Sequence, residues 1–91
     1  MEFEWDEAKA ASSLRKHGVD FEDALQIFAG RVRLASDLRR DHGEPRFIAL
    51  GEVSGDVLKV VFTHRGSAYR LISAWRAGKR DQATYRANDP G

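Results

Sequence analysis

The alternation of hydrophobic and polar residues is clearest over residues 69–76, which combine β-branched and aromatic side chains with no Pro or Gly. Such a stretch is typical of a β-strand. Successive side chains of a strand point to opposite faces, so alternation divides these residues into two sets. The two expected faces are Tyr69, Leu71, Ser73 and Trp75, and Arg70, Ile72, Ala74 and Arg76. Neither set is purely apolar, and arginines are rarely buried without a partner.

Two further strand patterns precede this one, at residues 46–53 and 57–64. The turns between the three strands are so short that only antiparallel hairpins are possible, which predicts a β-meander. Weaker alternation over residues 31–36 predicts an edge strand, and a short strand is expected at residues 2–5. The polar residues 37–45 are expected to form a loop.

Helix signals begin between the first two predicted strands. Residues 7–16 follow Asp6, which is suited to cap a helix N-terminus, and precede Gly18, which is suited to end the helix. The inward face of this helix is expected to be a stripe at helical spacing. The stripe consists of Ala8, Ala11, Leu14 and Arg15.

A second helix is predicted over residues 21–29, between Asp20 as its N-cap and Gly30 as its end. A third, short helix is expected over residues 79–88. The predicted fold class is therefore α+β, with two N-terminal helices packed on one face of an antiparallel β-meander and a short C-terminal helix. The other face of the sheet is expected to be partly open.

The composition fits a globular chain, because 42% of its 91 residues are hydrophobic and 32% are charged. This length suits one domain with one core, assigned to residues 1–91. Cys is absent, which excludes disulfides and favours a reducing compartment. No long apolar stretch occurs at the acidic N-terminus or elsewhere. We therefore expect a cytoplasmic protein with no secretory signal and no membrane contact.

Charge is unevenly distributed, although the net charge is only +1. Residues 1–45 contain 7 Lys/Arg and 10 Asp/Glu, a net charge of −3. Residues 46–91 contain 8 Lys/Arg and 4 Asp/Glu, a net charge of +4. A basic half favours an anionic partner such as nucleic acid. The alternative is ordinary scatter of charge over a solvated surface, and charge alone favours this alternative.

Several classes of site are excluded by residue spacing. His17, His42 and His64 lie in different predicted elements, and no two of them are at helical spacing, so no metal site is expected. Gly51 and Gly55 do not form a Gly-rich phosphate loop, and no Gly-x-Ser-x-Gly sequence is present. The expected protein therefore uses no metal and no other cofactor.

Cations and aromatic residues are interleaved in the last third of the chain. The cations are Arg65, Arg70, Arg76, Lys79 and Arg80, with Tyr69 and Trp75 among them and Arg46 expected across the sheet. Arginines hold phosphates through paired N–H groups, and aromatic rings stack on unpaired bases. This pattern predicts a surface for single-stranded RNA. The alternative is solvated edge charges with a Trp packed on the core, which composition alone slightly favours.

His17 has two possible roles. As a residue in the last turn of a helix, followed by Gly18, it fits a C-terminal cap that interacts with the helix dipole. As a group that titrates near neutral pH on a surface turn, it also fits a general acid or base.

Short stretches along the chain together point to a family. They are Glu4-Trp5-Asp6, Lys9, Lys16-His17-Gly18, Phe21-Glu22-Asp23-Ala24, Arg46-Phe47-Ile48-Ala49-Leu50-Gly51, Val60-Val61-Phe62-Thr63, Arg65 and Arg70-Leu71-Ile72-Ser73-Ala74. In their order and spacing, over roughly residues 4–86, the chain resembles the BrnT toxins, the ribonuclease partners of type II BrnT/BrnA toxin–antitoxin systems.

The resemblance implies a RelE-like fold and RNA cleavage that inhibits translation. It also implies a BrnA-like, ribbon-helix-helix antitoxin, bound in a heterotetramer and providing the only contact with DNA. Two residues depart from the family pattern. Ser13 stands where the family usually has Asn, and Trp75 stands where the strand usually has Arg. Arg76 is expected on the opposite face of the strand and is not a simple substitute for that Arg.

We therefore predict a metal-independent endoribonuclease in which the RNA 2′-hydroxyl attacks the adjacent phosphate to give a cyclic phosphate. This reaction needs a base, an acid and cations that stabilise charge on the phosphate. His17 is the candidate acid or base, and the candidates for transition-state stabilisation are Arg46, Arg65, Arg70 and Arg76. Lys16, Trp75, Lys79 and Arg80 are the candidates for RNA binding. The rival interpretation is a non-catalytic protein- or nucleic-acid-binding module, an inactivated toxin remnant.

Overall fold

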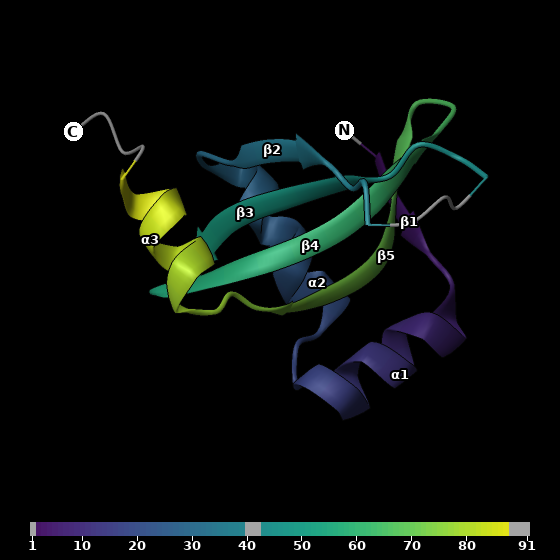
Figure 1. The fold of residues 1–91 in the computed structure, drawn as a ribbon. Coiled ribbons are helices and arrows are strands. Elements are labelled where there is room, and N and C mark those ends of the chain that lie inside the picture. Colours follow the sequence, from purple (N-terminus) through teal and green to yellow (C-terminus); the bar gives the residue numbers. More distant parts are fainter. Residues whose placement is uncertain (1, 40–42, 88–91) are drawn as a thin grey trace.

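The fold combines helices with one sheet, in a computed structural model that describes residues 2–39 and 43–87 (Figure 1). The elements in chain order are β1 (Glu2–Trp5), α1 (Glu7–His17), α2 (Phe21–Ala24), the 3₁₀ helix η1 (Leu25–Ala29), β2 (Arg33–Ser36), β3 (Phe47–Val53), β4 (Asp56–Arg65), β5 (Ala68–Arg76) and α3 (Lys79–Ala87). The predicted α+β class is confirmed, but two N-terminal helices packed together on one sheet face are not what the structure shows, because α1 packs mainly along β5. The predicted end of the last helix, Asn88, lies outside the described residues.

The sheet has five strands in the order β1-β5-β4-β3-β2. The antiparallel pairs β2–β3, β3–β4 and β4–β5 confirm the predicted meander. β1 pairs with β5 in parallel, with Glu2 opposite Ala68 and Trp5 opposite Leu71, so the expectation of a purely antiparallel sheet was wrong. Turn lengths predict the hairpins but carry no information about β1, because the rest of the chain separates it from its partner strand.

Local signals position the helix ends. The Asp6 carboxylate accepts a hydrogen bond from the Lys9 backbone N–H at 3.1 Å, and Gly18 ends α1 with a positive φ of 69°. The second predicted helix was wrong as one continuous element, since α2 is followed by the tighter η1. At that point Ile27 packs against β3, where a Cβ on Gly51 would lie 2.5 Å from the Ile27 Cβ.

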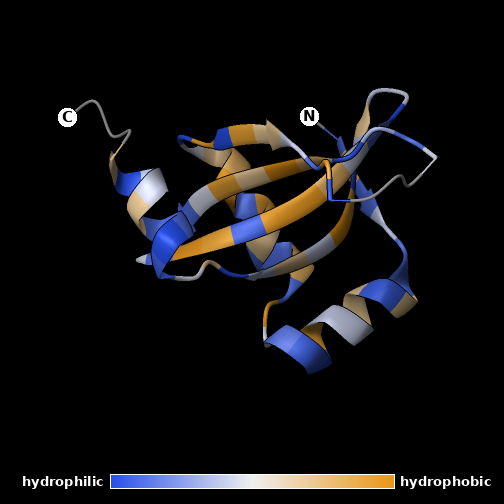
Figure 2. Cartoon of the chain, in the orientation of Figure 1, coloured by the Kyte–Doolittle hydropathy of each residue, from blue (hydrophilic) through white to orange (hydrophobic). Residues whose placement is uncertain are grey.

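The main core lies on the sheet face that α2 and η1 cover, which we call the α2 face. Its fully buried side chains include Phe21 and Ile27 from the helices and Phe62 and Leu71 from the strands. The hydropathy colouring in Figure 2 shows β3 and β4 as the most hydrophobic ribbons. Trp5 is partly buried at the edge of this core and packs edge-on against Phe21, at 5.9 Å between ring centroids.

The opposite sheet face, which we call the α3 face, has a smaller second core. Leu50 and Val57 are buried there together with Ala77 and Tyr85, so α3 covers one end of this face. Near the other end Thr63 is buried, and its hydroxyl donates to the Pro45 carbonyl at 2.6 Å. The α3 face is therefore covered at both ends by different segments.

A β-bulge in β5 overturns the predicted division of its side chains. Val61 of β4 lies opposite Ser73, but the next residue, Phe62, lies opposite Leu71, so Ile72 is the extra residue. The bulge shifts the alternation by one position. Leu71 and Ala74 thus both reach the α2 face, whereas Ser73 and Trp75 share the α3 face with Val61 and Lys59.

Helix α1 lies along β5, and its predicted inward stripe was also wrong (Figure 1). Ala8, Ala11 and Arg15 are exposed, as is 47% of Leu14, whereas Ser13 is buried. The Ser13 hydroxyl donates to the Ala74 carbonyl at 3.2 Å and accepts from the Ala74 N–H at 3.4 Å. β1 ends opposite Leu71, so beyond that point Ser13 satisfies backbone groups that β1 does not reach.

Tyr85 fixes α3 to the segment before β2, since its hydroxyl donates to the Arg31 carbonyl at 2.9 Å. The Arg31 guanidinium in turn lies 4.0 Å from the centre of the Tyr85 ring. Among the residues that the structure describes, no helix is long and apolar enough to cross a membrane.

Candidate nucleic-acid interface

Trp75 lies at the centre of the strongest candidate site. Its half-buried indole is on the α3 face, near the end of β5. Three groups from different parts of the chain surround it. The His17 ring lies 5.8 Å away, the Lys59 Nζ 5.7 Å away and the Arg39 Cζ 5.8 Å away. The fold therefore places a titratable group and two cations around one aromatic platform.

Arg39 is held in place by Asp37, whose side chain is fully buried. The Asp37 carboxylate accepts hydrogen bonds from Arg39 Nε at 2.8 Å and Nη2 at 2.9 Å. These hydrogen bonds raise the pKa of Arg39, so its guanidinium stays charged. Sequence reasoning missed both residues, because they fall in a segment interpreted only as a loop. The Asp-x-Arg spacing, with Asp37 also accepting from the Arg39 backbone N–H, was the available signal.

Lys59 is the second cation that sequence reasoning missed. It is a single charged residue within the apolar strand β4, and its Nζ donates to the Asp81 carboxylate at 2.9 Å. The sequence could have identified Lys59 by its position among apolar residues of the predicted strand, because an isolated Lys in such a strand needs a partner. Asp81 lies in the first turn of α3, so this contact joins the helix to the centre of the α3 face.

Three predicted arginines lie at the far end of the α3 face from Trp75. Arg46 and Arg65 share the Glu44 carboxylate, each at 3.6 Å, and Arg70 pairs with Glu4 at 2.9 Å. The Arg46 Nε is buried and has no hydrogen-bond partner among the described residues. The structure therefore gathers these arginines in one region, each facing a carboxylate.

This arginine region and Trp75 are separate along the sheet. Arg70 and Trp75 are five positions apart in β5, which corresponds to about 16 Å of strand. One phosphate cannot contact both. The two regions can instead contact different nucleotides of one strand of RNA.

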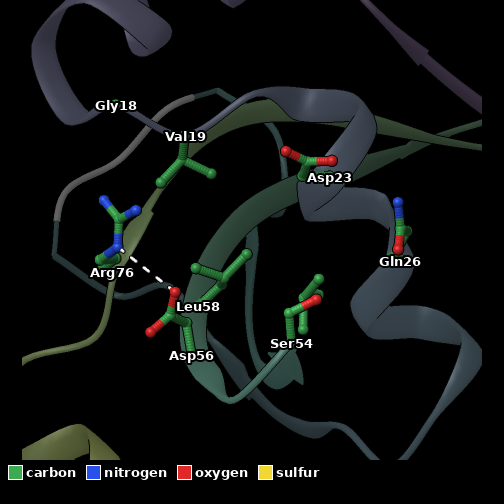
Figure 3. A pocket seen from close by; sticks show the side chains of 9 residues that line it. Gly18, Val19, Asp23, Gln26, Ser54, Asp56, Leu58 and Arg76 are labelled. Atoms are coloured by element: carbon green, nitrogen blue, oxygen red, sulfur yellow. Dashed lines mark ion pairs between the residues drawn. The ribbon is translucent and has the colours of Figure 1, made fainter.

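Arg76 does not belong to either region. It lies on the α2 side of β5, where its Nε is 3.8 Å from the Asp56 carboxylate. Figure 3 shows both residues at a cavity of about 320 Å³ that Asp23 and Gln26 also line. The bulge and the alternation of β5 thus place Arg76 away from the other predicted arginines.

The remaining predicted residues lie on two helices, α1 and α3. Lys16 and His17 line a second cavity, of about 220 Å³, between α1 and β5. Lys79 and Arg80 are exposed in the first turn of α3, next to Asp81.

No group of three or more potential metal ligands occurs within residues 2–39 and 43–87, and His42 lies outside them.

A comparison with protein families finds one that matches most of the chain. No curated protein matches the chain. Residues 5–81 match the family described as the ribonuclease toxin BrnT of type II toxin–antitoxin systems. The match begins at Trp5 and ends at Asp81, and therefore includes α1, the whole meander and the surroundings of Trp75. The chain belongs to the BrnT family of ribonuclease toxins, whose type II systems pair a toxin with an antitoxin.

Proposed function

We propose that this toxin is a metal-independent endoribonuclease whose catalytic centre lies around Trp75. The observation that carries the proposal is the convergence of His17, Lys59 and Arg39 on the Trp75 indole, at 5.7–5.8 Å. An aromatic platform, cations and an imidazole that can transfer a proton suit the cleavage of single-stranded RNA.

In the proposed reaction, a base removes the proton from the RNA 2′-hydroxyl. The O2′–P bond forms as the P–O5′ bond breaks, leaving a 2′,3′-cyclic phosphate and a 5′-hydroxyl that receives a proton from an acid. His17 takes one of these two proton-transfer roles. Lys59 and Arg39 stabilise the negative charge that develops on the phosphate oxygens, and Trp75 stacks on a neighbouring base.

The arginine region then binds a different part of the same RNA. Arg46, Arg65 and Arg70 contact backbone phosphates that displace the Glu44 and Glu4 carboxylates. Lys79 and Arg80 extend the basic surface along α3, and Lys16 extends it along α1. Arg76 is left out of this catalytic centre, because it lies on the other side of β5.

Cleavage of a single-stranded RNA with and without EDTA tests the proposal. We expect equal rates in both conditions, and products that carry a 2′,3′-cyclic phosphate and a 5′-hydroxyl. RNA with a 2′-O-methyl group at the cleaved position should resist cleavage. Activity that EDTA removes and one divalent metal restores would contradict the mechanism. RNA binding without any cleavage would favour the non-catalytic module.

We further propose that the antitoxin is a ribbon-helix-helix protein that binds this toxin in a heterotetramer and provides the contact with DNA. We also propose a RelE-like fold and action in the cytoplasm. The antitoxin is expected to cover the basic surface, because complementary charge favours such a complex. Charge reversal at Arg70 and Arg80 should therefore weaken co-purification of the pair, whereas reversal at Arg76, on the other side of β5, should not. Unchanged co-purification and unchanged complex mass would place the interface elsewhere.

A further inference from the structure

The cavity between α1 and β5 has a lining that the proposed chemistry around Trp75 does not explain. It measures about 220 Å³. The residues that line it are Lys9, Ser12, Ser13, Lys16, His17, Ile72 and Ser73. All but two come from one helix, and Ile72 and Ser73 come from the bulge of β5. The cavity therefore lies where the helix meets the irregular part of the strand.

The face that α1 turns toward this cavity has the wrong polarity for ordinary packing. Lys9, Ser12, Ser13 and Lys16 occur at the 3- and 4-residue spacing of one helix stripe. A helix packed on a sheet normally turns its apolar stripe inward, but the buried residue of α1 is Ser13, whereas Leu14 is 47% exposed. A sequence that breaks such a local rule often does so for function.

The charges around the cavity differ from those of the arginine region. None of its lining residues is acidic. Within the described part of the chain, neither Lys9 nor Lys16 has a carboxylate within ion-pair distance, whereas Arg46, Arg65 and Arg70 all do. Two ammonium groups without counter-charges thus flank a hollow that also has the hydroxyls of Ser12 and Ser73. Ammonium and hydroxyl groups are donors that suit a phosphate.

His17 joins this cavity to the candidate catalytic centre, since it lines the cavity and its ring lies 5.8 Å from the Trp75 ring. We propose that the cavity binds one backbone phosphate of single-stranded RNA, next to the nucleotide whose base stacks on Trp75. Lys9 and Lys16 together hold that phosphate, and the Ser12 and Ser73 hydroxyls donate to its oxygens. The proposal rests on the proposed ribonuclease function and assigns its substrate path across α1.

Binding of a fully 2′-O-methylated RNA tests this site without cleavage. The double variant Lys9→Gln/Lys16→Gln should bind at least tenfold more weakly at low salt, because contacts to charged groups are lost. The matched control is Arg15→Gln/Arg86→Gln, which removes the same charge from exposed positions outside the cavity. We expect the control to bind nearly as the unmodified protein does. Equal weakening in both double variants would overturn the proposal.

The salt dependence of binding shows whether both lysines contact one phosphate. Each phosphate contact on a single strand adds about −0.7 to the slope of log K against log salt concentration. In the double variant the slope should therefore become less negative by about 0.7. In each single variant it should change by most of that amount. An unchanged slope would show that the lysines contact no phosphate.

Titration with inorganic phosphate, followed by amide chemical shifts, separates this site from the proposed reaction. Ser12 and Ser73 should shift in the unmodified protein and stay unshifted in the double variant. Absence of these shifts in the unmodified protein would overturn the site even if RNA is cleaved. If the shifts occur and no RNA is cleaved, the ribonuclease mechanism fails while the phosphate site stands.

Discussion

The sequence leaves two roles open for His17, and its surroundings in the structure bear on both. A cap is not needed from its side chain, because the Gly18 N–H already donates to the Leu14 carbonyl at 2.8 Å. The exposed ring instead faces Trp75. At the scale of single residues, this position beside Trp75 is the one that the proposed proton-transfer role of His17 requires.

Replacing His17 by Gln should lower the rate of RNA cleavage by about 10²–10⁴-fold, because that is the usual contribution of a positioned acid or base. The thermal melting temperature should change little, since the ring is exposed. His64→Gln is the matched control, because His64, on β4, is also exposed but faces Phe47 of β3 and Tyr69 of β5. A His17→Gln protein that cleaves RNA at the unmodified rate would remove His17 from the mechanism.

The sequence identified some residues of the candidate site but not all of them. Trp75, Lys16 and His17 carry chemistry that stands out in the sequence itself. Arg39 does not, because its position over Trp75 depends on the path of the segment after β2. Such a path is determined by tertiary contacts, here the buried Asp37 carboxylate.

At the scale of elements, α1 and β5 depart furthest from their sequence patterns. Helix ends were predictable, because Asp6 and Gly18 act on backbone groups within a few residues. The bulge at Ile72 was not, since neither Gly nor Pro accompanies it and it depends on pairing with β4. The inward face of α1 was not predictable either, because its partner is the backbone of β5 rather than an apolar surface.

Ser13→Ala tests how much the junction between α1 and β5 depends on one hydroxyl. Both backbone groups of Ala74 would lose their partner in a buried position. We expect the free energy of unfolding to fall by about 1–3 kcal/mol. For a domain of this size, the melting temperature should fall by roughly 4–8 °C per kcal/mol.

Ser12→Ala is the neighbouring control, since its side chain has no hydrogen-bond partner within the described residues and is only half-buried. Denaturant unfolding of both variants measures the difference. Equal stability of Ser12→Ala and Ser13→Ala would show that the two hydrogen bonds at Ala74 contribute nothing.

At the scale of the whole molecule, the arginine region is largely neutralised by carboxylates of the protein itself. The −3 and +4 halves of the sequence meet in the fold, where Glu4 and Glu44 pair with arginines of the other half. Net charge along the chain predicted an anionic partner but not this pairing, which needs the contact between β1 and β5 and the segment before β3. In the proposed function, RNA therefore has to compete with carboxylates at the arginine region.

Glu44→Gln should accordingly tighten RNA binding. It frees Arg46 and Arg65, and exposed ion pairs contribute only about 0.2–1 kcal/mol each, so we expect an increase of about twofold to tenfold at low salt. Glu52→Gln is the matched control, since Glu52 pairs with Arg86 on α3, away from the arginine region. Binding to 2′-O-methylated RNA at several salt concentrations measures the effect. Tightening by both variants alike would indicate a general effect of net charge.

The pairing of β1 with β5 also has a consequence for the synthesis of this protein. Glu4 meets Arg70 across 66 positions of sequence, and Ser13 meets Ala74 across 61. Contacts of such long range form late and slow the folding of a small domain. A nascent chain that has not yet reached Trp75 has neither the aromatic platform of the proposed catalytic centre nor the strand that positions α1. Fragments from interrupted translation should therefore not cleave RNA, and toxicity should begin only with nearly complete chains.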